Sequence, residues 1–111
     1  MDISIFSALA EPNRLRIVEI LRDEGPQTVG SIAERVGIRQ PQASKHLHAL
    51  SEAGLVEVHP EANRRYYKLR VEAFQELEVW LDTYRRVWDE RLDNLDRYLT
   101  EMQMNEDNDK K

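Results

Sequence analysis

The stretch from Thr28 to Gly54 constrains the fold of this 111-residue chain more than any other, because it combines two short amphipathic helices with a tight turn. Thr28 suits the start of the first helix, since its hydroxyl can accept from a free N–H group of the first turn. Gly37 follows the apolar face of that helix and favours the left-handed residue that ends a helix. Pro41 suits the first turn of a second helix, which Gly54 ends. The pattern predicts a helix-turn-helix with its recognition helix over Pro41–Ala53.

The recognition helix is expected to bury Ala43, Leu47 and Leu50 and to expose polar side chains on its other side. No acidic residue occurs between Arg39 and Leu50. Gln and Lys side chains can hydrogen-bond to base edges, while Ser, Lys and a helix N-terminus suit phosphates. The DNA contacts predicted for this helix are Arg39, Gln40, Gln42, Ser44, Lys45, His46 and His48.

Two alternatives stand beside these DNA contacts. The segment could be a helical hairpin whose outer face is only solvated. His46 lies half a turn from the exposed positions, so plain packing competes with a backbone or phosphate contact there.

After Gly54 the sequence pattern becomes strand-like, with one run over 55–59 and another over 65–69. Residues 60–63 are expected to form the turn, with Asn63 most tolerant of a left-handed conformation. A β-hairpin directly after a recognition helix is the wing of a winged helix, here over residues 55–70. Alternation predicts that Tyr67 and Leu69 pack on the core. The tip residues suit phosphate or minor-groove contacts, unless the hairpin is simply solvated: Asn63, Arg64 and Arg65.

The remainder of the chain contains neither Gly nor Pro, and apolar residues recur every three or four positions from Phe74 to Met102. A helix of that length would extend about 43 Å, too long for one face to be buried against so small a domain. We therefore expect a helix over 72–102 that forms a dimer contact, joined by a first helix over Asp2–Leu9. The predicted dimer residues are Ile3, Phe6, Leu77, Leu81, Tyr84, Trp88, Leu92 and Leu95.

The length predicts a single domain, mainly α with a small β-hairpin: a winged helix-turn-helix over 1–102, followed by a flexible tail over 103–111. Within it, a further helix is expected from Pro12 to about Glu24, before the helix-turn-helix over 28–54. The chain has no cysteine, which excludes disulfides, thiolate metal sites and thiol redox sensing. No apolar run approaches the roughly 20 residues of a membrane span, and the N-terminus lacks a basic secretory segment. A cytoplasmic protein without membrane contact is expected.

The net charge of −5 is distributed unevenly. Residues 35–70 hold seven basic and three acidic residues, a net charge of +4, whereas residues 72–111 hold six basic and twelve acidic residues, a net charge of −6. Local charge decides phosphate attraction, since salt screens distant charges over about 8–10 Å. The basic module therefore suits double-stranded DNA, and the acidic helix is expected to face away from it. A two-fold homodimer would present two recognition helices to successive major grooves and bind an inverted repeat.

Several motifs together resemble the ArsR family of bacterial winged-helix repressors over roughly residues 6–70. They are Ala-Leu-Ala-Glu-Pro-Asn-Arg-Leu-Arg-Ile at 8–17, the Thr28–Gly54 stretch with Gln-Pro-Gln-Ala-Ser-Lys-His-Leu at 40–47, and Arg-Arg-Tyr-Tyr-Lys-Leu at 64–69. The resemblance implies a homodimeric transcriptional repressor whose terminal helices make the dimer. The pattern Trp80, Tyr84, Trp88, Arg91 and Leu92 also resembles a subgroup that lacks metal ligands.

The chain departs from the family's metal sensors. Many of them carry paired cysteines where this chain has Thr28 and Gly30, and others use histidines of the last helix, whereas no histidine follows His59 here. Aspartate and glutamate alone rarely hold a transition metal tightly. We therefore expect no cofactor and no metal at the usual sites. The wing also has Ala62 and Asn63 where relatives often have Gly-Arg.

An enzyme is not expected. Ser44, His46 and His48 form no triad, because groups on one helix point in different directions and no orienting acid is near. No glycine-rich phosphate loop occurs. The alternative to a DNA-binding regulator is a winged-helix protein-interaction module that binds a partner protein through the acidic C-terminal helix.

Overall fold

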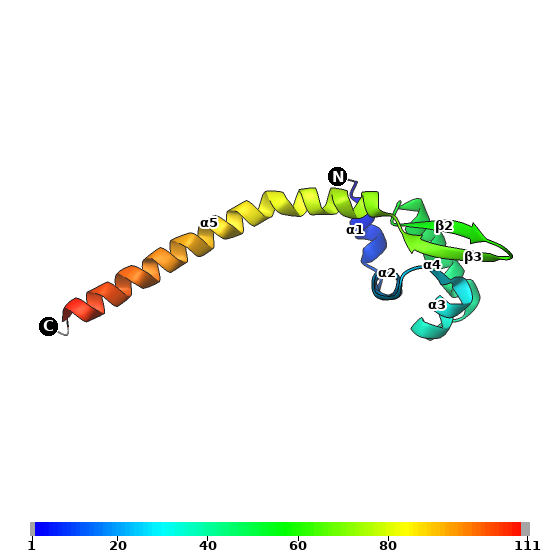
Figure 1. Cartoon of the computed structure of the whole chain (residues 1–111), viewed down its shortest axis with the longest axis horizontal. Helices are drawn as coiled ribbons and strands as arrows, with labels where there is room; N and C mark the ends of the chain where they lie inside the picture. The colour runs from blue at the N-terminus through cyan, green and yellow to red at the C-terminus, as the bar shows by residue number, and fades with distance from the viewer. Residues whose placement is uncertain (1, 110–111) are drawn as a thin grey trace. The chain divides into compact units, whose positions relative to one another are not determined.

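The computed structural model describes residues 2–109 of the chain (Figure 1). The chain divides into two compact units, Met1–Glu76 and Leu77–Lys111. In chain order its elements are α1 (Ser4–Leu9), α2 (Pro12–Glu24), β1 (Gln27–Thr28), α3 (Val29–Val36), α4 (Gln40–Glu52), β2 (Val56–Glu61), β3 (Arg64–Leu69) and α5 (Val71–Asp109). The mainly helical architecture with a small β-hairpin is thereby confirmed.

The helices of the first unit begin and end at residues whose chemistry explains them. Glu11 caps α2 by accepting a hydrogen bond from the Arg14 backbone N–H at 2.9 Å, with Pro12 in the first turn. Thr28 caps α3 by accepting from the Ser31 backbone N–H at 3.2 Å. Gly37 ends α3 in the left-handed conformation with φ of 79°. The two helices of the helix-turn-helix are therefore α3 and α4, joined by a short turn.

The sheet has three antiparallel strands in the order β1-β3-β2. The wing is the hairpin β2–β3, in which Val56 pairs with Leu69 and Glu61 with Arg64. The third strand, β1, was not predicted, and it pairs Gln27 with Tyr67 and Thr28 with Tyr66. This pairing joins the start of the helix-turn-helix to the wing through backbone hydrogen bonds.

The wing turn is tighter than predicted. Both strands extend beyond the expected runs, so the loop consists of Ala62 and Asn63 alone. Ala62 has a φ of 55°, and it is the one non-glycine residue with a positive φ among the described residues. The prediction that Asn63 takes the left-handed conformation is therefore wrong. The pairing of Glu61 with Arg64 forces a two-residue turn, and such turns place the left-handed strain on their first central residue or on both.

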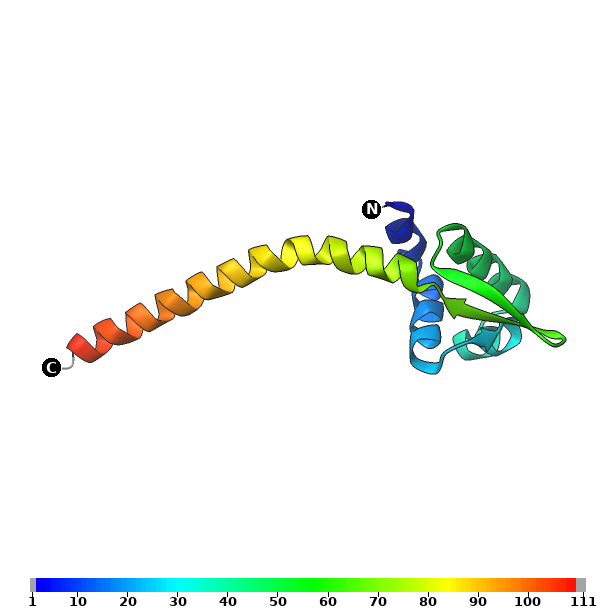
Figure 2. The same ribbon diagram turned by 45° about the horizontal axis from the view of Figure 1, so that its top comes forward.

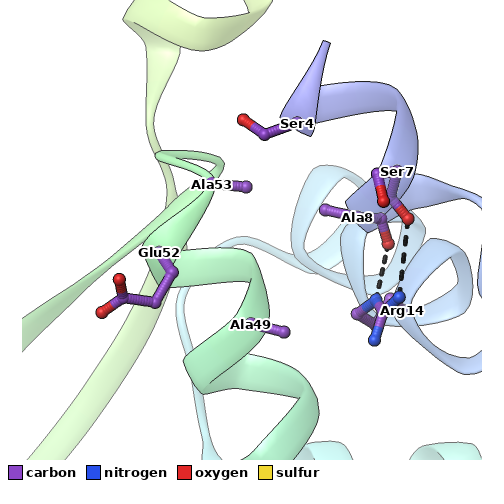
Figure 3. A pocket seen from close by; sticks show the side chains of 7 residues that line it. All are labelled: Ser4, Ser7, Ala8, Arg14, Ala49, Glu52 and Ala53. Atoms are coloured by element: carbon purple, nitrogen blue, oxygen red, sulfur yellow. Dashed lines mark hydrogen bonds between the residues drawn. The ribbon is translucent and has the colours of Figure 1, made fainter. Parts of the chain in front are cut away.

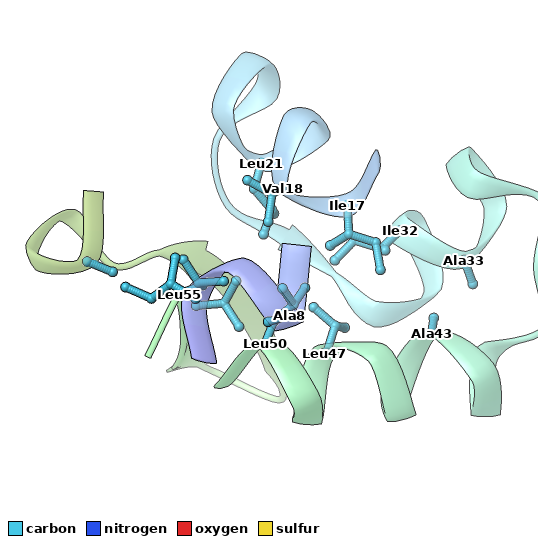
Figure 4. Packing of buried hydrophobic residues seen from close by; sticks show 13 residues of the cluster. Ala8, Ile17, Val18, Leu21, Ile32, Ala33, Ala43, Leu47, Leu50 and Leu55 are labelled. Atoms are coloured by element: carbon cyan, nitrogen blue, oxygen red, sulfur yellow. The ribbon is translucent and has the colours of Figure 1, made fainter. Parts of the chain in front are cut away.

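The core of the first unit is formed where α4 packs against α1, α2 and α3. Figure 4 shows Ala43, Leu47 and Leu50 of α4 directed toward the other helices. All three are fully buried, as predicted, together with Ile17 and Ile32. Tyr67 and Leu69 of the wing pack against this core, which confirms their predicted face. Truncating Leu47 to Ala would cost about 2–5 kcal/mol of folding stability, because the surrounding helices cannot close the cavity completely.

The long helix α5 begins close to the predicted position but continues to Asp109, so that residues 103–109, expected as part of a flexible tail, are helical. Residues 110 and 111 lie outside the described residues. Within α5, the rings of Trp80 and Tyr84 pack edge to face with centroids 4.9 Å apart. No helix of the described chain is long and apolar enough to cross a membrane.

Candidate nucleic-acid interface

The outer face of α4 presents most of the predicted DNA-contact residues together. Because Ala43, Leu47 and Leu50 fix the buried side, the positions between them on the helix point outward. The exposed residues of the predicted set are Arg39, Gln40, Gln42, Ser44, Lys45 and His48. Of these, His48 has an acidic neighbour one turn on, with its Nε2 3.8 Å from the Glu52 carboxylate.

Two glutamines at the start of α4 have defined positions. The Gln42 side-chain oxygen accepts a hydrogen bond from the Arg39 backbone N–H at 3.2 Å and so closes the first turn of the helix. Gln40 lies over α3, where its Oε1 would be 3.9 Å from a Cβ placed on Gly30. The N-terminus of the recognition helix is therefore capped by its own side chain, and the amide nitrogen of Gln42 carries no hydrogen bond among the described residues.

His46 does not share this face. Its side chain is only 20% exposed, and its Nδ1 lies 3.6 Å from the Glu11 carboxylate. The same Glu11 oxygen accepts from the Arg14 backbone N–H, so one carboxylate both caps α2 and contacts the recognition helix. The sequence left two roles open for His46, packing or a phosphate contact. In the structure its side chain is packed against Glu11. Sequence analysis missed Glu11, although its position before Pro12 is typical of a helix cap.

The wing tip forms a second exposed cluster. Asn63, Arg64 and Arg65 are all exposed, at the end of the hairpin that projects from the helices of this unit in Figure 2. Further along the same hairpin, Lys68 is paired with Glu57 at 3.3 Å. The tip thus carries two cations at the start of β3, directly after the two-residue loop.

The cations of the two clusters are not neutralised by neighbouring acids. In residues 2–109, no ion pair involves Arg39, Lys45, Arg64 or Arg65. Other basic side chains of this unit do have acidic partners: Arg22 pairs with Asp23 at 2.8 Å, and Arg35 pairs with Glu24. The Asp23 carboxyl consequently has a pKa below its usual range, because Arg22 donates hydrogen bonds to it. The cations at the start of α4 and at the wing tip therefore keep their charge unpaired among the described residues.

Arg14 has a structural role. Its Nε donates to the Ala8 carbonyl at 2.6 Å and one terminal nitrogen to the Ser7 carbonyl at 3.5 Å, as Figure 3 shows. Both carbonyls belong to the last turn of α1, and the Ser7 carbonyl also accepts from the Ala10 backbone N–H at 3.4 Å. A shallow hollow of about 320 Å³ lies beside Arg14, with Ala49 and Ala53 of α4 on its opposite side. Arg14 thereby holds α1 against α2.

The predicted dimer residues lie on α5, on α1 and, for Ile3, directly before α1. Ile3 is 79% exposed, whereas Leu77 is half-buried. The others are exposed in the single chain: Phe6, Leu81, Tyr84, Trp88, Leu92 and Leu95. No group of three or more His, Cys, Asp or Glu side chains within the described residues is arranged to hold a metal ion.

Comparison with known proteins agrees with this architecture. The sequence family described as a helix-turn-helix domain matches residues 9–59. The transcriptional repressor SdpR of Bacillus subtilis (strain 168) is 32% identical over 78 residues, which cover 70% of this chain and 86% of SdpR.

Two solved structures are similar to the chain. The crystal structure of an ArsR family transcriptional regulator has a TM-score of 0.65 and 31% sequence identity, and the match covers 78% of this chain and 88% of the other. The solution structure of a homodimeric winged helix-turn-helix DNA-binding domain from Mycobacterium bovis has a TM-score of 0.59 and 34% identity, covering 71% of this chain and 76% of that one. With α3 and α4 as its helix-turn-helix and β2–β3 as its wing, the chain belongs to the ArsR family of winged-helix transcriptional regulators.

Proposed function

We propose that this protein is a homodimeric transcriptional repressor that binds an inverted-repeat operator. Gln40, Gln42, Lys45 and His48 read the DNA from α4, Lys45 through its charge and the other three at base edges, with Arg39 and Ser44 at the flanking phosphates. Asn63, Arg64 and Arg65 of the wing contact phosphates or the minor groove. Repression, rather than activation, follows the similarity to SdpR, whose name describes a repressor.

The observation that carries this proposal is the coincidence of exposure, polarity and unpaired positive charge on α4. The exposed face of α4 contains no acidic residue from Arg39 to Leu50 and lies opposite a fully buried stripe. Its polar and basic side chains are of the kinds that hydrogen-bond to base edges and phosphates in a major groove. The wing adds Arg64 and Arg65, which have no acidic partner among the described residues. A two-fold dimer doubles these contacts, and its half-sites would lie about one helical turn of DNA apart.

Dimerisation is assigned to the exposed apolar residues of the terminal helices. In this proposal α1 and the residue before it contribute Phe6 and Ile3, and α5 contributes Leu77, Leu81, Tyr84, Trp88, Leu92 and Leu95. The homodimeric state of the similar Mycobacterium bovis domain supports a dimer of this chain.

The proposal is tested by recovering bound genomic fragments with the purified protein and measuring their affinity for variants. Lys45→Ala combined with Arg64→Ala should weaken binding to every fragment and lower the salt dependence by about one charge per lost contact. The matched control is Arg22→Ala combined with Arg70→Ala, which removes the same formal charge from residues paired with Asp23 and Glu72. Unchanged promoter binding by the first pair would reject DNA recognition through α4 and the wing, and would favour a protein-interaction module.

We also propose that no metal ion bound at the helix-turn-helix releases the protein from DNA. Thr28 is used as the cap of α3, and Gly30 offers no side chain. Adding Zn²⁺, Cd²⁺ or arsenite should therefore leave the affinity for the recovered fragments unchanged. Release by any of them, lost in a variant of the responsible ligands, would overturn this part of the proposal.

A further inference from the structure

The hollow beside Arg14 lies within the first unit, between α1 and the C-terminal half of α4. We call it the α1–α4 hollow. Its volume of about 320 Å³ is at the lower end of the range in which proteins bind small molecules. In Figure 3, the guanidinium of Arg14 lies on one side of it and the methyl groups of Ala49 and Ala53 on the other. The hollow therefore has a charged side and an apolar side.

The positive charge of Arg14 has no acidic partner. Arg14 is half-buried, and no carboxylate lies within ion-pair distance of its guanidinium among the described residues. The bonds to the Ala8 and Ser7 carbonyls use two of its five side-chain N–H groups and hold it in place. The Ser7 hydroxyl, which also lines the hollow, forms no hydrogen bond within residues 2–109. A fixed guanidinium with free N–H groups beside a hydroxyl suits a carboxylate.

The opposite wall of the hollow is built from small apolar side chains. Ala49 and Ala53 of α4 are half-buried, and their methyl groups face α1 in Figure 3. Farther round the same helix, Leu47 and Leu50 fill the core completely. The space left between α1 and α4 is thus of the kind that an apolar chain fills, because doing so removes the alanine wall from water.

Glu52 restricts the anion to a single charge. It also lines the hollow, but its carboxylate points away from Arg14 in Figure 3 and lies 3.8 Å from the Nε2 of His48. One guanidinium balances one negative charge. A dicarboxylate or a phosphate would bring a second negative charge, which Glu52 repels. The ligand that fits these groups is a monocarboxylate with an apolar chain.

We infer that the α1–α4 hollow is an effector site for a small monocarboxylate, with the carboxylate on Arg14 and Ser7 and the apolar chain along Ala49 and Ala53. The inference rests on the proposed function and names the class of signal that acts on it. A ligand in the hollow contacts α1, which belongs to the proposed dimer contact, and α4, the recognition helix. Ligand binding therefore depends on the placement of α4 in the dimer, and by linkage ligand and operator change each other's affinity by the same factor.

Calorimetric titration of the full chain with hexanoate, in the absence of DNA, tests the ligand class. We expect saturable binding of hexanoate and about tenfold weaker binding of two compounds of the same length. Hexanamide lacks the charge that Arg14 would meet, and 6-aminohexanoate would place an ammonium group against the alanine wall. The site is wrong if neither hexanoate nor the bulkier phenylacetate binds saturably. Equal binding of hexanamide, or tighter binding of 6-aminohexanoate, would overturn the monocarboxylate class.

Filling the hollow tests its location. Ala49→Leu should abolish hexanoate binding, because the larger side chain occupies the hollow while Arg14 keeps its hydrogen bonds. Ser51→Leu is the matched control, since it adds a leucine at an exposed position of α4 that does not line the hollow, and it should bind hexanoate like the parent chain. Unchanged hexanoate affinity in Ala49→Leu would show that the ligand binds elsewhere.

Arg14→Gln gives a second measurement of the site. Because Arg14 also holds α1, a general loss of affinity would not distinguish a ligand contact from a structural role. The ratio of hexanoate to hexanamide affinity does distinguish them. If Arg14 binds the carboxylate, this ratio should fall from about tenfold to near one in the variant. An unchanged ratio would leave Arg14 with its structural role alone and overturn the carboxylate contact.

The effector role is measured with the genomic fragments recovered for the proposed function. Saturating hexanoate should change the affinity of the parent chain for a bound fragment by about fivefold or more, and should leave that of Ala49→Leu unchanged. Hexanoate that binds in the calorimeter without changing DNA affinity would overturn the effector role. A chain that binds hexanoate but no DNA fragment would instead reject the proposed function, so the two failures are distinguishable.

Discussion

At the scale of single residues, Gln42 combines two roles that compete for its side chain. Its Oε1 accepts from the Arg39 backbone N–H at 3.2 Å, and its amide nitrogen is left to donate outward. A glutamine held in this way can donate to acceptors such as guanine O6 or thymine O4. Bidentate pairing with adenine requires both ends of the amide, and would break the cap on binding. The local structure of α4 thus influences which bases it recognises.

Gln42→Glu should separate capping from base recognition. A carboxylate accepts from the Arg39 N–H as well as an amide does and interacts favourably with the helix N-terminus, so thermal stability should be kept. The outward donor is lost, so operator affinity should fall and base preference should move toward cytosine, whose amino group donates. Gln42→Ala, the control, should lose about 0.5–1 kcal/mol of stability as well. Selection from a randomised operator would contradict base contact by Gln42 if both variants kept the original preference.

Ala62 carries backbone strain at the wing tip. Its φ of 55° is a left-handed conformation, which costs a residue with a side chain about 1–2 kcal/mol relative to glycine. Ala62→Gly relieves this strain but raises the entropy of the unfolded chain by about 0.4–1 kcal/mol. We expect a net gain of about 0.5–1 kcal/mol, measured by urea unfolding. Asn63→Gly is the matched control without a left-handed φ and should destabilise the protein; equal gains in both variants would contradict the assignment.

These residues also show where sequence is sufficient and where it is not. Thr28 and Gly37 were predictable because caps act within one helical turn and depend on neighbours in sequence. The strain at Ala62 depends on the pairing of Glu61 with Arg64, which follows from strand register rather than residue preference. The side-chain position of His46 depends on Glu11, a contact across 35 positions that no local pattern encodes.

At the scale of secondary-structure elements, Glu11 connects the start of α2 to the middle of α4. Its carboxylate accepts from Arg14 N–H at 2.9 Å and lies 3.6 Å from His46 Nδ1. Arg14 in turn holds the last carbonyls of α1. The three helices are therefore linked by polar contacts around the apolar core, and the recognition helix is fixed in rotation as well as in position.

A double-mutant cycle on Glu11 and His46 tests this link. If His46 braces the helix, Glu11→Ala and His46→Ala should be non-additive in unfolding free energy by about 0.5–1 kcal/mol. The salt dependence of DNA binding should then be unchanged in His46→Ala, because no phosphate contact is lost. An additive cycle, with the salt slope lower by about one, would instead assign His46 to the DNA backbone.

The ends of helices and strands were predictable where apolar residues recur at a regular spacing. They were not predictable where the sequence has no such spacing. The recognition helix differs from its predicted range by one residue at each end. The strand β1 consists of two residues, too short for any alternation to appear in the sequence, and exists because β3 offers it a backbone edge. Residues 103–109 were expected outside the helix because they are polar, but no Gly or Pro interrupts α5 there.

At the scale of the whole molecule, the chain combines a basic stretch, which includes the recognition helix and the wing, with an acidic helix that carries an apolar face. Residues 35–70 have a net charge of +4 and can be attracted to DNA although the whole chain is at −5. One such unit offers few base contacts. Two units joined by a dimer raise the effective concentration of the second at its half-site, which is how a small domain attains operator affinity.

Trp88→Glu combined with Leu92→Glu should therefore disrupt both assembly and function. Burying four carboxylates in a two-fold helical seam is costly, so light scattering should show monomers. The first unit should remain folded, because its core from Ile5 to Ala73 includes neither residue. Affinity for a full inverted repeat should fall by a factor of 10² or more, roughly the avidity that linkage supplies, while affinity for a single half-site should change little. Asn94→Glu combined with Thr100→Glu adds the same charge on the outer side and should leave the dimer intact. A dimeric Trp88/Leu92 variant would show that α5 is not the element that joins the subunits.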